Sequence, residues 1–239
     1  MAKITESFKI TINDVNAKFT CTNKAILRIF ETIACSHSDM AGYGASNVEK
    51  TRLSWVLIRW KVKILERPSY GDTVKVVTWA RDTGKITTHR EFQMFLPNGK
   101  LSAIGSTKWA LIDIDKGLTK IDNIITEQYS PEKECVFDET ELKKLSSPTE
   151  FESSISYTVT RKDLDINQHV HNLNYLDFAY ELIPDEVYFK EVDNIEIYYK
   201  TESKLGDNLE FRLTRENDGY TVAIVNKKTD ALNTVIKLY

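Results

Sequence analysis

Close cysteine pairs are missing from this sequence. Its three cysteines, Cys21, Cys35 and Cys135, are spread over 239 residues, and no spacing between them suits a metal site or a redox motif. An odd number of well-separated cysteines is typical of reduced thiols, so we expect a protein of the cytoplasm. His37 and His89 are also isolated, and we therefore predict no metal and no cofactor.

Long apolar runs are missing too. No segment approaches the roughly 20 apolar residues that cross a bilayer, and the first residues show neither an apolar signal core nor an arginine-rich leader. The sequence has no Gly-x-Ser-x-Gly elbow and no glycine-rich phosphate loop. These absences argue against a membrane span, an α/β-hydrolase and a phosphate-binding loop protein.

A strong excess of one charge is likewise absent. The formal net charge is -3, which gives no reason to expect binding to nucleic acid. The chain is 41% hydrophobic and 28% charged, a composition typical of a soluble globular protein. A chain of this length forms either one large domain or two of ordinary size.

One order of elements occurs twice along the chain. Strand, helix and antiparallel strands are indicated in the first half at 7–12, 23–35, 55–65, 73–81, 87–96 and 103–114. The second half repeats this order at 154–160, 172–183, 194–200, 208–215, 220–226 and 232–238. The apolar residues of the first helix, from Ala25 to Ile33, recur at helical spacing. Repetition of a helix with an antiparallel sheet predicts an α+β architecture.

The segment between the halves has the composition of a linker. It runs from 127 to 150, is polar and charged, and contains two prolines, with a short helix expected at 139–145. We therefore predict an N-terminal domain at 1–126 and a C-terminal domain at 151–239. Two such domains in one chain could pair with each other, so a monomer and a homodimer are both compatible with the sequence.

Polar residues whose side chains could take part in catalysis alternate just before the second predicted helix. Asp165, Asn167 and His169 would point to one side of an extended segment. A helix predicted to begin at Asn172 would place the amides of Asn172 and Leu173 beside them. Amides at a helix start stabilise developing negative charge, so this pattern favours an acyl-transfer site.

These residues carry a family likeness. Residues 165–170, followed by Asn172 and Tyr175, resemble a signature of acyl-acyl-carrier-protein (acyl-ACP) thioesterases of the plant and bacterial type. Residues 66–72 with Trp79, and residues 106–109, resemble the same family. The resemblance covers nearly the whole chain and implies a tandem hot-dog fold, with each antiparallel sheet wrapped around a long central helix. It also implies hydrolysis of acyl-ACP thioesters to free fatty acid and holo-ACP.

The resemblance further implies that Asp165, Asn167, His169 and Glu202 form the site. Ser203 occupies a position where many members have cysteine, and a serine is a much weaker nucleophile than a thiolate. Hydrolysis by water is then the better hypothesis: Glu202 accepts a proton, Asn167 and His169 hold the water or the thioester, and Asp165 orients a neighbour. The alternative interpretation is that Asp165 and Asn167 are turn residues and Glu202 a solvated residue at a strand end.

The resemblance also implies an acyl tunnel and a surface for the acidic carrier protein. Tunnel candidates in the first half are Ile29, Phe30, Ile33, Met40 and Trp55, although each could simply be a core residue. Docking candidates are the basic residues Arg59, Lys61, Lys63 and Arg81, three of which alternate along one strand. Two other functions remain open: an acyl-CoA thioesterase and a non-catalytic acyl-binding module.

Overall fold

The computed structural model describes residues 2–189 and 191–239, and the chain divides into two compact units between Leu142 and Lys143. The N-terminal unit contains β1 (Lys3–Lys9), η1 (Ile12–Asp14), α1 (Asn23–Met40), η2 (Ala45–Asn47), α2 (Val48–Thr51), β2 (Leu53–Ile64), β3 (Thr73–Thr83), β4 (Thr87–Phe95), β5 (Leu101–Asp113), β6 (Gly117–Leu118) and α3 (Asn123–Tyr129). Its strands follow the order β1-β3-β4-β5-β2, all antiparallel, with β6 beside β5.

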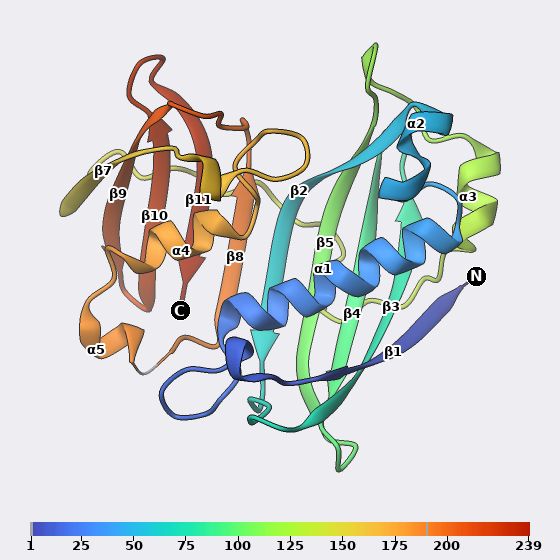
Figure 1. Ribbon diagram of the computed structural model, residues 1–239, viewed down its shortest axis with the longest axis horizontal. Coiled ribbons are helices and arrows are strands. Elements are labelled where there is room, and N and C mark those ends of the chain that lie inside the picture. Colours follow the sequence, from blue (N-terminus) through green and yellow to red (C-terminus); the bar gives the residue numbers. More distant parts are fainter. Residues whose placement is uncertain (1, 190) are drawn as a thin grey trace. The chain divides into compact units, whose positions relative to one another are not determined.

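Helix α1 lies across one face of this sheet (Figure 1). Thr22 caps its start by accepting a hydrogen bond from the amide of Ala25 at 3.2 Å, as a threonine N-cap does. Phe30, in the middle of the helix, stacks on Phe92 of β4 with ring centres 4.9 Å apart. A Cβ atom added to Gly105 would lie 2.9 Å from the Phe30 ring, so a glycine on β5 permits this close packing.

The C-terminal unit contains β7 (Ser153–Thr158), η3 (Arg161–Asp163), α4 (Asn174–Tyr180), α5 (Asp185–Tyr188), β8 (Asn194–Tyr199), β9 (Asn208–Glu216), β10 (Gly219–Asn226) and β11 (Ala231–Leu238). Its strands follow the antiparallel order β8-β11-β10-β9-β7. Helix α4 crosses one face of the sheet (Figure 1), where Phe178 stacks on Phe211 with ring centres 5.0 Å apart. Each unit is thus an antiparallel sheet with a helix packed on it, which confirms the predicted α+β fold.

Two local predictions need correction. The second helix begins at Asn174 and has 7 residues, whereas the sequence predicted 172–183. The helix expected at 139–145 is not formed. This region follows a segment that is held on the first sheet by its backbone: Glu134 O accepts from the Trp79 indole at 3.0 Å, and the Val136 amide donates to the Glu91 carboxylate at 3.2 Å. Within the described part of the chain, no helix is long and apolar enough to cross a membrane.

Candidate active site

Residues 165–169 form a tight turn in the C-terminal unit. The Asp165 amide donates to His169 O at 2.8 Å, and the Gln168 amide donates to Asp165 O at 3.1 Å. Gln168 adopts a left-handed conformation with φ 63°, while Leu164 and Val170 pair as antiparallel neighbours at the base of the turn. The expectation of an extended segment with alternating side chains was therefore wrong here, because the chain reverses direction between the two pairing residues.

Asp165 orders this turn through its side chain. Its Oδ1 accepts hydrogen bonds from the amides of Asn167 at 2.8 Å and His169 at 3.2 Å. An aspartate that binds the backbone two and four residues ahead fixes the shape of a turn. Asp165 thus holds the backbone from which the side chains of Asn167 and His169 project. Asn167 itself is exposed at the turn.

The structure brings His169 and Glu202 together. Nδ1 of His169 lies 3.0 Å from Oε2 of Glu202. The two chain segments are joined by a backbone hydrogen bond from the Val170 amide to Ser203 O at 2.9 Å, and His169 pairs with Lys204 as an isolated β-bridge. The side chains of His169 and Glu202 are 26% and 56% exposed. Glu202 is therefore largely open to solvent.

Ser203 is buried in a polar cluster with Tyr175 and Asn233. Its Oγ accepts a hydrogen bond from the Tyr175 hydroxyl at 2.8 Å and another from Nδ2 of Asn233 at 2.9 Å. Burial raises the pKa of Tyr175 to about 12, so this phenol stays protonated and remains a donor near neutral pH. Ser203 is 0% exposed, and this environment gives it a packing and hydrogen-bonding role.

Asn233 is a residue of this site that sequence reasoning missed. It lies on β11 and is 1% exposed. Its Nδ2 also donates to Thr201 O at 3.1 Å and to Glu202 O at 3.2 Å, so one amide holds the segment that carries Glu202. An asparagine shortly before the apolar residues Val235 and Ile236 in the last strand was the signal that could have revealed it.

The two backbone amides that were predicted to bind an oxyanion, those of Asn172 and Leu173, differ in the structure. The Leu173 amide donates to Nδ1 of His171 at 3.3 Å, and the Tyr199 hydroxyl donates to Asn172 O at 2.9 Å. Leu173 is the residue that precedes helix α4, so its amide is already engaged near the helix start. Of the two predicted donors, Asn172 is the one whose amide makes no hydrogen bond within the described part of the chain.

The N-terminal unit contains the same turn without the same chemistry. Oδ1 of Asn16 accepts from the amides of Lys18 at 2.9 Å and Thr20 at 3.2 Å, and Phe19 has φ 60°. The next segment is joined by a hydrogen bond from the Cys21 amide to Pro68 O at 2.8 Å.

The two turns match bond for bond, which places Asn16 where the C-terminal unit has Asp165 and Thr20 where it has His169. Arg67, the residue before Pro68, corresponds to Glu202. The turn is therefore a property of the fold, whereas the histidine–carboxylate pair belongs to the C-terminal unit.

The tunnel candidates occupy two different environments. Ile29, Phe30 and Ile33 on α1 are at most 1% exposed and pack between the helix and the sheet. Trp55 is half-buried, and its indole donates to the Tyr129 hydroxyl at 2.9 Å. Met40, the last residue of α1, is 57% exposed, so it lies at the surface of the unit.

The docking candidates do not form a common exposed surface. Arg59 and Arg81 are 3% and 5% exposed, and Nε of Arg81 lies 3.4 Å from Glu91. Lys61 is paired with Glu139 from the segment that follows α3, and its side chain is 17% exposed. Lys63 is exposed. Arg59 and Arg81 are too buried to present their charge to a protein partner, and Lys63 is the exposed one of the four.

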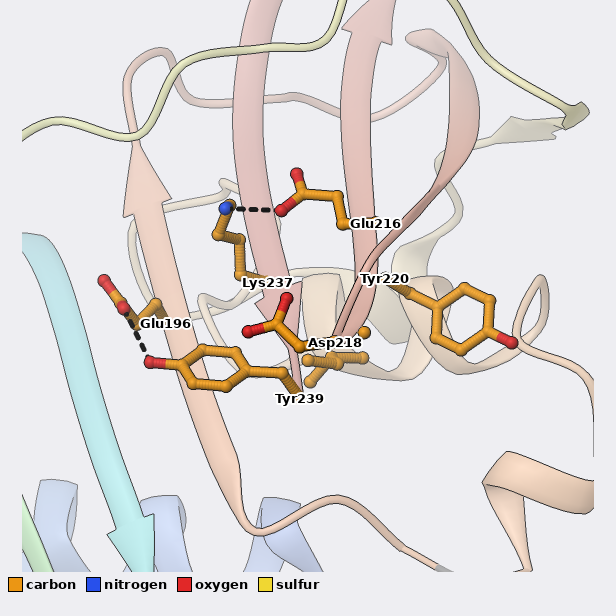
Figure 2. A pocket seen from close by; sticks show the side chains of 8 residues that line it. Glu196, Glu216, Asp218, Tyr220, Lys237 and Tyr239 are labelled. Carbon is orange, nitrogen blue, oxygen red and sulfur yellow. Dashed lines mark hydrogen bonds and ion pairs between the residues drawn. The ribbon is translucent and has the colours of Figure 1, made fainter.

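A cavity elsewhere in the C-terminal unit has a volume of about 230 Å³. It is lined by residues of β8, the β9–β10 turn and the end of β11. Figure 2 shows two contacts between side chains that line it: Nζ of Lys237 donates to the Glu216 carboxylate at 2.7 Å, and the Tyr239 hydroxyl donates to the Glu196 carboxylate at 3.0 Å. His169 and Glu202 are not among its lining residues.

Two sheet-and-helix units, one of which carries the histidine–carboxylate pair, define a tandem hot-dog protein. Comparisons with known proteins agree. Residues 1–131 match the family model for the acyl-ACP thioesterase N-terminal domain, and residues 146–237 match the model for the C-terminal domain. The chain belongs to the acyl-ACP thioesterase family.

Solved structures share this fold over nearly the whole chain. An acyl-ACP thioesterase from Bacteroides thetaiotaomicron aligns with a TM-score of 0.87 and 21% identity, covering 99% of this chain and 96% of its own. The 12:0-ACP thioesterase from Umbellularia californica aligns with a TM-score of 0.83 and 20% identity, with coverage of 99% and 96%. These alignments establish the fold.

Curated plant proteins are similar in sequence. Oleoyl-acyl carrier protein thioesterase 1, chloroplastic, from Arabidopsis thaliana is 27% identical over 221 residues, which is 84% of this chain and 61% of that protein. The corresponding Coriandrum sativum thioesterase is 25% identical over 89% of this chain and 63% of its own length. The chain thus spans about three fifths of the length of these relatives.

Proposed function

We propose that this protein hydrolyses acyl-ACP thioesters to a free fatty acid and holo-ACP. The observation that supports this most is the contact between His169 and Glu202, at 3.0 Å. The equivalent turn of the N-terminal unit has Thr20 and Arg67 at these two positions. Family membership supports the substrate class, since the curated relatives are named as acyl carrier protein thioesterases. We assign hydrolysis to the C-terminal unit and acyl binding to the N-terminal unit.

The geometry of the pair favours His169 as the group that takes a proton from water. When Nδ1–H of an imidazole donates to a carboxylate, the proton is fixed there and Nε2 is left as an acceptor. Glu202 then orients the ring and stabilises its charged form, as a carboxylate does in other hydrolytic sites. This differs from the hypothesis based on sequence, in which Glu202 was the base, because Glu202 is more than half exposed.

The other residues in and next to the turn position His169 and supply the remaining groups that the reaction needs. Asp165 fixes the backbone at His169 by accepting a hydrogen bond from its amide at 3.2 Å, and Asn167, exposed two residues before His169, is the proposed side chain that helps to hold the water or the thioester. The Asn172 amide is the proposed donor to the thioester oxygen. A thiolate leaves readily, so the reaction needs an activated water and an oxyanion donor more than a strong acid.

We also propose a reducing, cytoplasmic setting. All three cysteines are free thiols, and Cys21 is buried; unpaired thiols suit a compartment that keeps cysteine reduced. The plant relatives are named as chloroplastic proteins.

Release of free thiol from acyl-ACP and acyl-CoA substrates of several chain lengths tests the proposal. The account predicts turnover of acyl-ACP by the wild type, with a strong loss in Glu202→Gln and little loss in Ser203→Ala. Preference for acyl-CoA would indicate a thioesterase for that substrate class. Folded wild-type protein that binds acyl chains but turns over no thioester would contradict the proposal and favour an acyl-binding module.

A further inference from the structure

Arg90 is a buried cation of the N-terminal unit, and its partners are uncharged. It lies on β4 and is 6% exposed. Nη1 donates to Nδ1 of His37 at 2.9 Å and contacts Oγ1 of Thr78 at 3.4 Å, while the guanidinium carbon lies 5.8 Å from the centre of the Tyr129 ring. Among the residues that the structure describes, no carboxylate lies within 4.0 Å of this guanidinium.

A buried charge in this state is energetically unusual. Moving a cation out of water is costly unless it is paired with an opposite charge, and burial lowers the pKa of Arg90. Arginine nevertheless keeps its proton in proteins. The Tyr129 ring face and the His37 nitrogen offset part of this cost. Arg81, on the adjacent strand, is paired with a carboxylate as buried cations usually are, since Glu91 lies 3.4 Å from it.

The free side of the Arg90 guanidinium has the shape of a carboxylate site. Both of its hydrogen bonds leave from Nη1, so Nε and Nη2 donate none of the bonds found within the described part of the chain. The Nε–Nη2 edge of arginine carries two parallel N–H groups that match the two oxygens of a carboxylate.

The layer between α1 and the sheet next to Arg90 is largely apolar. Residues 90 and 92 of β4 are two apart, so they share a sheet face, and Phe92 stacks on Phe30 of α1. On α1, Ile33 precedes His37 by one turn, and both are 0% exposed. Figure 1 shows α1 crossing β4. A ligand that reached Arg90 along this layer would contact aliphatic and aromatic groups on the way.

We propose that the N-terminal unit binds an aliphatic carboxylate through the Nε–Nη2 edge of Arg90. A fatty acid and a short free carboxylate share the chemistry that this edge recognises. The site is separate from the His169–Glu202 pair, and it is tested by binding without turnover. Failure of this proposal would therefore leave the proposed hydrolysis untouched, and the reverse also holds.

Isothermal titration of the wild-type chain with octanoate, octanamide and acetate tests the site. We expect octanoate to bind at least about tenfold more tightly than its neutral amide, since a charged partner strengthens a buried hydrogen-bonded pair. Arg90→Met should abolish this preference. Lys63→Met, which removes an exposed charge from the same unit, should keep it. If acetate competes with octanoate, the site takes short carboxylates. If acetate does not compete, the site takes fatty acids. Both outcomes support a carboxylate site.

Equal binding of octanoate and octanamide by the wild type would overturn the proposal, as would a preference that persists in Arg90→Met. If Arg90→Met does not fold, carboxyl-¹³C octanoate bound to the wild type gives an independent measurement. The resonance of the bound ligand should stay in its ionised position as the pH falls through about 4 to 5, where a free alkyl carboxyl gains its proton. A bound resonance that titrates together with the free ligand would overturn the proposal.

Discussion

Replacing Asp165 by asparagine separates a role in shaping the turn from a direct role in catalysis. The side chain accepts two backbone hydrogen bonds, at 2.8 and 3.2 Å. Asn16 accepts the equivalent bonds in the N-terminal unit at 2.9 and 3.2 Å, so an amide oxygen satisfies the same turn. Asp165→Asn should therefore cost only about 0.5 kcal/mol of unfolding free energy, whereas Asp165→Ala, which removes the acceptor, should cost about 1 kcal/mol.

The expected rates differ more than the stabilities. Without its acceptor the turn no longer fixes His169, and a shift of about 1 Å in a reacting group can lower a rate roughly 100-fold. We expect Asp165→Ala to lose about that factor in kcat/KM for acyl-ACP, and Asp165→Asn to remain within about tenfold of wild type. Urea unfolding and thiol release measure the two effects. An Asp165→Asn protein that is folded but as inactive as Asp165→Ala would refute the reasoning, because it would show that the carboxylate charge acts in the reaction.

Three further predictions concern the surrounding structure. Ser203→Ala removes the acceptor of two buried hydrogen bonds and should lower the unfolding free energy by about 1 to 3 kcal/mol in urea titrations, while thiol release stays near wild type. Burial raises the pKa of Tyr175 to about 12, above its unfolded value near 10. The folded state therefore holds this proton more tightly, and its stabilising effect should be full below about pH 10 and lost between about pH 10 and 12. Tyr175→Phe should remove that alkaline dependence from unfolding curves, and an unchanged dependence would contradict the assignment. Phe30→Ala should cost about 3 to 5 kcal/mol because the ring is fully enclosed; a thermal unfolding shift near zero would contradict its place in the core.

Local patterns in the sequence predicted the elements well. The spacing of Ile26, Ile29, Phe30 and Ile33 predicted α1, and all four are buried, because a helix must place such residues on one face. The resemblance at residues 165–170 pointed to a site whose histidine does contact Glu202. The same pattern was also interpreted as an extended segment, and that prediction failed because aspartate and asparagine also favour tight turns.

Long-range packing could not be predicted in this way. Arg59 and Lys61 alternate with apolar residues as a solvated strand face does, yet Arg59 is buried and Lys61 pairs with Glu139. The partner of Lys61 is far away in the sequence, so spacing along the strand carries no information about it. Asn233 and Arg90 are buried polar residues that become informative only when the groups around them are known.

We expect the chemistry to take place at the turn of the C-terminal unit and not at its counterpart in the N-terminal unit. Steady-state hydrolysis of acyl-ACP by His169→Ala and by Thr20→Ala tests this directly, since the two residues occupy equivalent positions. We expect the rate to fall about 100-fold or more in His169→Ala, because a proton acceptor is removed, and to stay near wild type in Thr20→Ala. Equal losses in the two variants, or an active His169→Ala protein, would contradict it.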